Sequence, residues 1–370
     1  MTAQRHSIVE LAKVFLRLGF VAFGGPAAHI ALMEDELVER RKWLEREQFL
    51  DFMALTQLIP GPNSTELVIH LGQHRAGWRG LVVAGMVFLL PACVMSALLG
   101  WVYLKVGALP EVAHLLAGIK PVVVILVARA LWKMKGGALK DWHRMIVCAA
   151  VIGMVGFGLS PVVALLAGAG SLWLARVLAR PREKVPALAA VALLPLFGVF
   201  FKVGAVLFGS GYVLLAFLQA ELVETRGWLT ANQLMDAIAV GQITPGPLLS
   251  TSSFIGIILS GPRGALVATV GMFLPSFVFV ALLGKFWPKM QGSPGFRRFL
   301  DGAVAGAVGL LAVALVQLAA GGLQDVASIA IAVGALVLWW WKPKLSAAWV
   351  LLAGAGAGWL MAVLMPATGA

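Results

Sequence analysis

Apolar segments follow one another along this whole chain, and only short polar stretches separate them. Hydrophobic residues make up 60% of its 370 residues and charged residues only 12%, whereas soluble domains carry about 25% charged residues. Such a chain cannot bury its apolar surface by folding alone, so the lipid bilayer has to be its solvent. We therefore expect an all-α polytopic membrane protein without a sizeable soluble domain. The apolar segments lie near residues 8–33, 49–72, 80–103, 113–134, 145–159 and 161–178, and near 188–219, 233–258, 264–286, 299–320, 325–341 and 345–365.

The second half of the chain repeats the first at an offset of about 185 residues. Residues 15–62 align with residues 200–247 without a gap, and 20 of the 48 aligned positions are identical. Self-similarity of this kind indicates a duplicated structural unit. We therefore expect one copy in residues 1–180 and a second in residues 188–370, joined by a basic cytoplasmic linker at 181–187.

Equivalent loops of the two copies differ in their number of basic residues. The stretch 34–48 carries four basic residues and its counterpart 220–232 carries one, while 133–144 carries four and its counterpart 321–325 carries none. Cytoplasmic loops of membrane proteins carry an excess of Lys and Arg. The two copies are therefore expected to cross the membrane in opposite orientations, as inverted-topology repeats do in many transporters.

An inverted arrangement requires an odd number of crossings in each copy, although each copy has six apolar segments. The second segment of each copy contains a Pro-Gly-Pro tripeptide, at residues 60–62 and 245–247. A proline inside a helix removes a hydrogen-bond donor and clashes with the preceding turn. Irregular backbone at membrane depth is tolerated only inside protein or beside a watery cavity. We therefore expect both second segments to be re-entrant, which gives about ten transmembrane helices and places both termini outside, although the bases near the N-terminus favour the cytoplasm.

Interruptions at matching positions in the two copies predict a central site for an anion. The first segments are interrupted by Phe-Gly-Gly-Pro at 23–26 and Phe-Gly-Ser-Gly at 208–211, and the second segments by Pro-Gly-Pro. A half-helix that begins at such a break has unpaired N–H groups and a partial positive charge, which suit an oxyanion. Close packing of small residues, helix capping and, for the two glutamines, hydrogen bonding between helices are the alternative roles. The residues expected to bind substrate are Gly24, Gly25, Pro26, Gln57, Pro60, Gly61, Pro62, Asn63, Ser64, Thr65, Gly209, Ser210, Gly211, Gln242, Pro245, Gly246, Pro247, Ser250 and Thr251.

Three basic residues within apolar segments are candidates for charge compensation. Arg17 aligns with Lys202, so these two would form a symmetric cation site or extend to a membrane interface. Arg129 has no charged counterpart in the second copy. It would bind substrate or pair with an acid such as Glu66 or Asp51.

Acidic residues and one histidine lie close to the Pro-Gly-Pro breaks. Glu66 and His70 are four residues apart and share a helical face, whereas the matching stretch 252–256 has no ionisable residue. A protonatable pair in one copy only would couple protons to transport, or would form an interfacial pair at the mouth of the re-entrant segment. Asp51 and Asp236 open the re-entrant segments, and we expect them to cap these helices.

These motifs resemble those of the chromate ion transporter (CHR) family in its long form, in which two homologous domains are fused. The resemblance covers essentially the whole chain. It implies a multi-pass protein of the plasma membrane that exports chromate and gives chromate resistance, with sulfate as a competing isostere. The motifs that carry it are Phe-Gly-Gly-Pro at 23–26, Arg-Arg-Lys-Trp-Leu at 40–44, Pro-Gly-Pro-Asn-Ser-Thr at 60–65, the stretch from Gly72 to Gly80, Phe-Gly-Ser-Gly at 208–211 and Pro-Gly-Pro at 245–247.

We therefore expect a secondary transporter, not an enzyme, whose partners are a chromate- or sulfate-type oxyanion and the lipid bilayer. Export of a dianion gains energy from a membrane potential that is negative inside, whereas sulfate uptake would require coupled protons. Uptake or exchange of sulfate or another oxyanion is the alternative. A cation transporter is disfavoured because the breaks lack clusters of Asp, Glu, His or Cys, and a membrane-embedded enzyme because the usual catalytic motifs are missing. No metal, cofactor or nucleic acid is expected, and a homodimer stays open.

Overall fold

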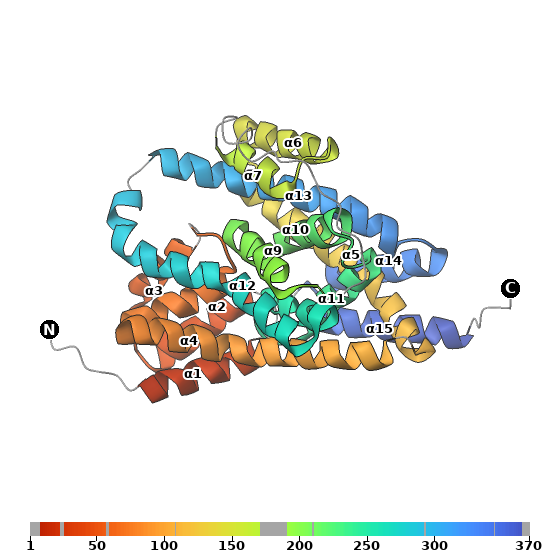
Figure 1. Ribbon diagram of the computed structural model, residues 1–370, viewed down its shortest axis with the longest axis horizontal. Coiled ribbons are helices and arrows are strands. Elements are labelled where there is room, and N and C mark those ends of the chain that lie inside the picture. The colour runs from red at the N-terminus through yellow and green to blue at the C-terminus, as the bar shows by residue number, and fades with distance from the viewer. Residues whose placement is uncertain are drawn as a thin grey trace. The chain divides into compact units, whose positions relative to one another are not determined.

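The computed structural model describes a chain of helices, in keeping with the predicted all-α class (Figure 1). It describes residues 8–22, 26–56, 59–107, 109–170, 191–208, 211–291, 294–343 and 345–364. No strand occurs within these ranges. The predicted linker at 181–187 lies outside them.

Several of these helices have the length and composition to cross a bilayer. Among the described residues, four helices are long and apolar enough to do so: Asn63–Val106, Glu111–Ala138, Leu248–Leu282 and Arg298–Gly322. Shorter apolar helices cover Trp142–Gly156, Leu193–Val206, Val326–Trp341 and Ala347–Val363. A multi-pass membrane protein follows from these helices, while the number of ten crossings and the inverted arrangement stay predictions.

The chain divides into two compact units, and each unit contains segments from both halves of the sequence. Unit 1 comprises Met1–Leu98, Ala192–Gly211 and Thr244–Arg297, and unit 2 comprises Leu99–Val191, Tyr212–Ile243 and Arg298–Ala370. The predicted repeat boundaries at 1–180 and 188–370 describe sequence copies and stay a prediction.

Unit 1 holds both Pro-Gly-Pro tripeptides, the first interrupted segment of the first copy and the first part of the long helix that follows each tripeptide. Its elements are α1 (Ile8–Val21), α2 (Pro26–Glu34), the π-helix η1 (Asp35–Arg40), α3 (Arg46–Thr56), the start of α4 (Asn63–Val106), α9 (Leu193–Val206), the 3-10 turn η3 (Leu248–Ser250) and α12 (Thr251–Gln291).

Unit 2 holds the remaining helices. These are α5 (Pro110–Ala138), α6 (Trp142–Gly156), α7 (Pro161–Ala169), α10 (Val213–Leu218), the π-helix η2 (Gln219–Thr225), α11 (Ala231–Ile243), α13 (Pro294–Gly322), α14 (Val326–Trp341) and α15 (Ala347–Leu364).

The predicted interruptions are confirmed as ends of helices. Helix α1 ends at Val21 and α2 begins at Pro26, while α3 ends at Thr56 and α4 begins at Asn63. In the second copy, α9 ends before the Phe-Gly-Ser-Gly motif and α11 before Pro-Gly-Pro. The missing donor of proline and the freedom of glycine explain why each helix stops where these residues cluster.

Two boundaries differ from the sequence-based expectation. The stretch 73–79, expected to separate two apolar segments, is a sharp kink within α4 at Gly77 (φ +63°), and Gly261 (φ +62°) forms the matching kink in α12. Glycine tolerates this left-handed conformation at little steric cost. The stretch 34–48 was read as a loop, yet it is helical through η1 because its residues are mostly good helix formers.

Close approaches of helices position the breaks within unit 1. Gly19 of α1 lies against the Phe88 carbonyl of α4, and Gly204 of α9 lies against the Met272 carbonyl of α12. Gly19 and Gly204 occupy matching positions in the two copies. A side chain at either position would collide with the backbone of the neighbouring helix, so the missing Cβ sets how closely the first helix of each copy packs.

Candidate functional site

The two Pro-Gly-Pro breaks are hydrogen-bonded, within unit 1, to the first segments of the opposite copies. The N–H of Gly61 donates to the carbonyl of Leu207 at 2.7 Å, and the N–H of Gly246 donates to the carbonyl of Ala22 at 2.7 Å. Leu207 directly precedes Phe-Gly-Ser-Gly, and Ala22 directly precedes Phe-Gly-Gly-Pro. Because the exchange is reciprocal, each Pro-Gly-Pro break lies against the residue that precedes the interruption in the opposite copy's first segment.

The central glycine of each tripeptide also packs against the long helix of the other copy. A Cβ on Gly61 would lie 2.6 Å from the Ser276 hydroxyl, and a Cβ on Gly246 would lie 2.7 Å from the Cβ of Ala92. Ala92 and Ser276 occupy matching positions, each directly after a proline. Both glycines have positive φ angles, +139° and +97°. Conformation and space therefore both require glycine here.

Each tripeptide ends in the same tight turn. The carbonyl of Pro62 accepts from the N–H of Thr65 at 2.7 Å, and the carbonyl of Pro247 accepts from the N–H of Ser250 at 2.9 Å. Pro60 and Pro245, the first residues of the tripeptides, are buried. Proline fixes φ and so favours such turns, which explains why both copies stop and restart a helix in the same way.

After the first break, the Ser64 hydroxyl contacts His29, a residue that the sequence analysis does not predict for the site. The Ser64 hydroxyl is 3.2 Å from Nδ1 of His29 on α2, and His29 is 1% exposed. The hydroxyl of Thr65 is buried and has no hydrogen-bond partner. His29 is the one histidine of its apolar segment, and the second copy has leucine at the matching position. That asymmetry was the available signal for it.

Hydroxyl groups after the second break bond to other elements of unit 1. The Ser96 hydroxyl of α4 donates to the Ser250 hydroxyl at 3.1 Å, and the Thr251 hydroxyl donates to the Leu248 carbonyl at 2.7 Å. The hydroxyl of Ser252 is buried without a partner. No side-chain cap forms at the start of η3, so these contacts favour site or packing roles over capping.

Glu66 links the first break to the second copy. Its side chain is fully buried, and Oε1 accepts a hydrogen bond from the Ser276 hydroxyl at 2.8 Å. Among the described residues, neither its other oxygen, Oε2, nor Nε2 of His70, which is 3% exposed, has a hydrogen-bond partner. Both residues therefore lie inside the protein, close to the Pro-Gly-Pro break.

Unpartnered buried polar atoms gather around the two breaks. Buried polar atoms in proteins are nearly always hydrogen-bonded, so a group of exceptions in one place indicates where a polar ligand or water binds. Within the described part of unit 1, the imidazole, hydroxyl and carboxyl atoms concerned are His29 Nε2, Thr65 Oγ1, Glu66 Oε2, His70 Nε2 and Ser252 Oγ.

Some predicted site residues lie outside the described part of the chain. Of the others, Pro26 begins α2, and Asn63 begins α4 and is partly buried. Gly211 lies in contact distance of Leu248 and Leu249, directly after the second Pro-Gly-Pro. The undescribed residues are Gly24, Gly25, Gln57, Gly209 and Ser210.

Gln242, at the end of α11, belongs to unit 2. Its side chain is hydrogen-bonded to Tyr212, and its Nε2 is buried without a partner. Gln242 thus bonds to Tyr212, which directly follows Phe-Gly-Ser-Gly in the sequence, as a bridging role predicts. Its amide nitrogen has no partner among the described residues.

The three predicted cations have different surroundings. The Arg17 side chain is 65% exposed, and its NH1 lies 3.9 Å from the Glu36 carboxylate, which Arg41 binds more closely at 2.8 Å. Lys202 is partly buried on α9. Arg129, in unit 2, donates to the Pro343 carbonyl at 2.6 Å and lies over the ring of Trp339.

The expectation that Asp51 and Asp236 cap their helices is wrong. Helices α3 and α11 begin at Arg46 and Ala231, five residues before these aspartates. The start of α11 is capped by Thr230, whose hydroxyl accepts from the N–H of Gln233 at 3.2 Å while the Gln233 side chain accepts from the Thr230 N–H at 2.9 Å. This Thr-x-x-Gln capping box was present in the sequence.

Asp236 is instead part of a buried contact inside unit 2. Its Oδ2 accepts a hydrogen bond from the Tyr103 hydroxyl at 2.9 Å, and Asp236 is 4% exposed. Asp51, at the matching position, is exposed. The two aligned aspartates therefore have different roles.

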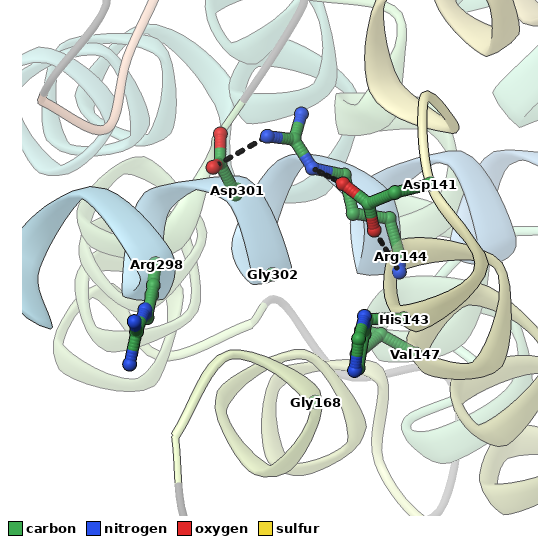
Figure 2. Close-up of a pocket in the computed structure, with 8 residues that line it drawn as sticks. All are labelled: Asp141, His143, Arg144, Val147, Gly168, Arg298, Asp301 and Gly302. Atoms are coloured by element: carbon green, nitrogen blue, oxygen red, sulfur yellow. Dashed lines mark hydrogen bonds and ion pairs between the residues drawn. The ribbon is translucent and has the colours of Figure 1, made fainter.

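A pocket of about 560 Å³ in unit 2, with charged residues in its lining, is a second candidate site. Figure 2 shows Arg144 between two carboxylates, those of Asp141 and Asp301, and ion pairs join it to both. His143 and Arg298 also line the pocket. Because two acids balance two arginines there, the pocket offers little net attraction for an anion, and the breaks in unit 1 are the stronger candidate.

Comparison with known proteins gives a consistent result along the chain. The profile of a family described as chromate transporter matches residues 9–173 and 194–359. The chain is 33% identical to a chromate transport protein of Pseudomonas aeruginosa, over 96% of this chain and 92% of that protein. It is also 33% identical to a chromate transport protein of Cupriavidus metallidurans, over 91% of this chain and 89% of that protein. No solved structure matches the chain.

Proposed function

Because this chain belongs to the chromate transporter family, we propose that it carries chromate across the plasma membrane through a site formed by the two Pro-Gly-Pro breaks. The relatives are named as transport proteins, which supports a carrier rather than an enzyme. Sulfate, which has the same shape and charge, is the expected competitor.

The observation that carries the site assignment is the reciprocal bonding of the breaks. The Gly61–Leu207 and Gly246–Ala22 hydrogen bonds bring all four interruptions into one unit. Around them lie unpartnered hydroxyl and imidazole groups, including Thr65 and Ser252. Such groups can replace the water that surrounds an oxyanion in solution, because each can donate a hydrogen bond to it.

The bonds also limit how the breaks bind an anion. The N–H groups of Gly61 and Gly246 already donate to carbonyls of the opposite copy. The oxyanion is therefore expected to bind to hydroxyl and imidazole side chains and to the free N–H groups at the helix starts, not to the glycine amides. The glycines hold the two copies together around the site.

An inverted arrangement of the copies is part of the proposal. In each pair of equivalent loops one copy carries more basic residues than the other, and a reciprocal exchange between matched residues is the pattern that a two-fold relation produces. In transporters with inverted repeats the substrate binds between the repeats near the middle of the bilayer. We place about ten crossings and two re-entrant segments in this arrangement.

The energetics favour export from a cell that is negative inside. Moving one charge through 100 mV changes the free energy by ~2.3 kcal/mol, so a dianion that leaves gains ~4.6 kcal/mol. Export that follows the potential would lower internal chromate and so give resistance to it.

Transport into proteoliposomes with an imposed potential tests the proposal. Chromate is expected to move toward the positive side, and its flux is expected to grow with the potential and to fall when sulfate is added. A matched control is a preparation of the Gly61→Ala variant at equal protein density. Absence of chromate flux from the wild-type vesicles, at any potential, would refute the proposed function.

A further inference from the structure

The first copy places a carboxyl group at its Pro-Gly-Pro break, and the second copy does not. Glu66 occupies the position that Thr251 occupies in the second copy. The space beside Gly61 is filled by Glu66 Oε1 and the Ser276 hydroxyl, whereas the space beside Gly246 is filled by Ala92. The carboxyl group therefore lies directly against the backbone of the break.

The surroundings of Glu66 do not supply a compensating charge. In the described part of the chain, no Lys, Arg or His forms an ion pair with it, and its one side-chain partner is the Ser276 hydroxyl of α12. His29 of α2 contacts Ser64, which lies on the same helix, α4, as Glu66. An ionised carboxylate buried in this way has lost its water and has no counter-charge among the described residues, so its charge is costly there.

The remaining titratable neighbour is on the same helix. His70 lies one turn after Glu66, and its ring stands 6.1 Å from that of Phe52, which α3 contributes. Nε2 of His70 has no partner, and neither has Oε2 of Glu66. Ser276 is therefore the side chain that contacts the carboxyl, and His70 is the next titratable residue along α4.

An oxyanion bound at the break changes which form of the acid is tolerated. An ionised Glu66 beside a dianion would place three negative charges in a buried site, and repulsion would weaken binding. A protonated Glu66 carries no charge, and its O–H can donate a hydrogen bond to the anion. Binding of the dianion therefore requires a proton on this carboxyl.

We propose that Glu66 is a proton-binding site of the transporter, and that one proton is bound and carried together with each oxyanion. This rests on the proposed function and deepens it, because it names the coupled ion. The proton comes from solvent, adds to a carboxylate oxygen of Glu66 and leaves to solvent when the anion is released. The net charge moved in each cycle is then one negative charge instead of two.

Chromate flux under a pH gradient, with the potential held at zero, tests this proposal. Both compartments are kept alkaline, so that free chromate is the dianion on both sides. Wild-type protein is expected to drive chromate toward the more alkaline side, to a ratio of about tenfold for each unit of pH difference. Glu66→Gln has the shape of the acid but cannot bind a proton, so the chromate ratio maintained by the pH gradient is expected to disappear, whatever potential-driven flux the variant has.

The exposed acid of α3 provides the matched control. Asp51→Asn removes an exposed carboxylate from α3, the helix that precedes the first Pro-Gly-Pro, and this variant is expected to respond to the pH gradient as the wild type does. A Glu66→Gln protein that still follows the pH gradient would overturn the proposal. So would wild-type flux that follows the potential but ignores the gradient, and in that case the proposed function would still stand.

Proton uptake by the wild-type protein keeps the proposal testable if Glu66→Gln does not fold. Chromate is added to purified protein in weakly buffered alkaline solution that contains a pH indicator. At a pH high enough to ionise Glu66 in the free protein, we expect up to one proton to be taken up for each chromate bound. Chromate binding without proton uptake would refute coupling at Glu66, whereas absence of chromate binding would instead refute the proposed function.

Discussion

The N–H of Gly61 donates to the carbonyl of Leu207 at 2.7 Å, and this hydrogen bond attaches the first Pro-Gly-Pro break to the first segment of the other copy. The equivalent bond from Gly246 to Ala22 has the same length. Neither break is therefore completed by its own copy. Several consequences of this exchange, and of the packing around it, can be measured.

Substitution of Gly61 or Gly246 by alanine is expected to destabilise the protein and to abolish transport. The added methyl group would collide with Glu66 and Ser276 in the first case and with Ala92 in the second, and both backbones are in a conformation that disfavours alanine. We expect a loss of about 2–4 kcal/mol in stability. Thermal unfolding in detergent, together with chromate flux, measures both effects.

Gly77→Ala is the matched control for these two variants. Gly77 also has a positive φ, but nothing lies within 4 Å of the position of its Cβ. It should therefore show the backbone effect alone, about 1 kcal/mol. Gly61→Ala is expected to lose more stability than Gly77→Ala. Equal losses would contradict the close contact of Gly61 with Glu66 and Ser276.

Replacement of His29 by leucine is expected to weaken chromate binding while the protein still folds. Leucine occupies the matching position of the second copy, so the substitution fits the packing of that repeat. It removes the hydrogen bond to Ser64 and leaves a buried hydroxyl without a partner. A loss of about 1–2 kcal/mol corresponds to roughly tenfold weaker binding.

Chromate titration of purified protein measures the effect of His29→Leu. Ile30→Leu, the neighbouring substitution that also introduces the second copy's residue, is the control and should bind chromate as the wild type does. Unchanged affinity in His29→Leu would remove this histidine from the site.

The crossing of α5 and α15 in unit 2 should distinguish two nearby glycines. A Cβ on Gly358 would lie 2.6 Å from the backbone of Gly118, whereas a Cβ on Gly356 would meet nothing within 4 Å. Gly358→Ala is expected to lower stability by about 1–3 kcal/mol. Gly356→Ala should be neutral or slightly stabilising, since alanine is the better helix former. Equal melting temperatures of the two variants would contradict this crossing.

The pocket in unit 2 is expected to take no part in transport. Arg298 lines that pocket with Arg144 and its two acids. Arg298→Ala should therefore leave chromate flux within about twofold of wild type, as expected for an exposed side chain outside the site. A large loss of flux in this variant would make the pocket, and not the breaks, the better candidate site.

The sequence was sufficient to predict the helical class and the positions at which helices are interrupted, because proline and glycine act on the backbone locally. Duplication strengthened these predictions, since each break occurs twice. The kinks at Gly77 and Gly261 are not predicted by the apolar pattern, because a glycine does not indicate by itself whether the helix resumes at once.

The partners within the site could not be predicted in the same way. Glu66 meets Ser276, which is 210 positions further along the chain, and no local pattern connects two such residues. Asp236 was expected at a helix end, yet a capping box five residues earlier starts the helix, and the aspartate binds Tyr103 instead. Contacts between distant segments depend on how helices pack, which periodicity and composition do not specify.

The exchange of hydrogen bonds between the breaks also affects how the two halves of this protein can evolve. A substitution near Ala22 changes the support of Gly246, and one near Leu207 changes the support of Gly61. A mutation in one half therefore first affects the packing of the other half, where any compensating substitution has to arise. The duplicated halves are free to acquire different chemistry, as Glu66 illustrates, but their breaks have to be inherited as a pair.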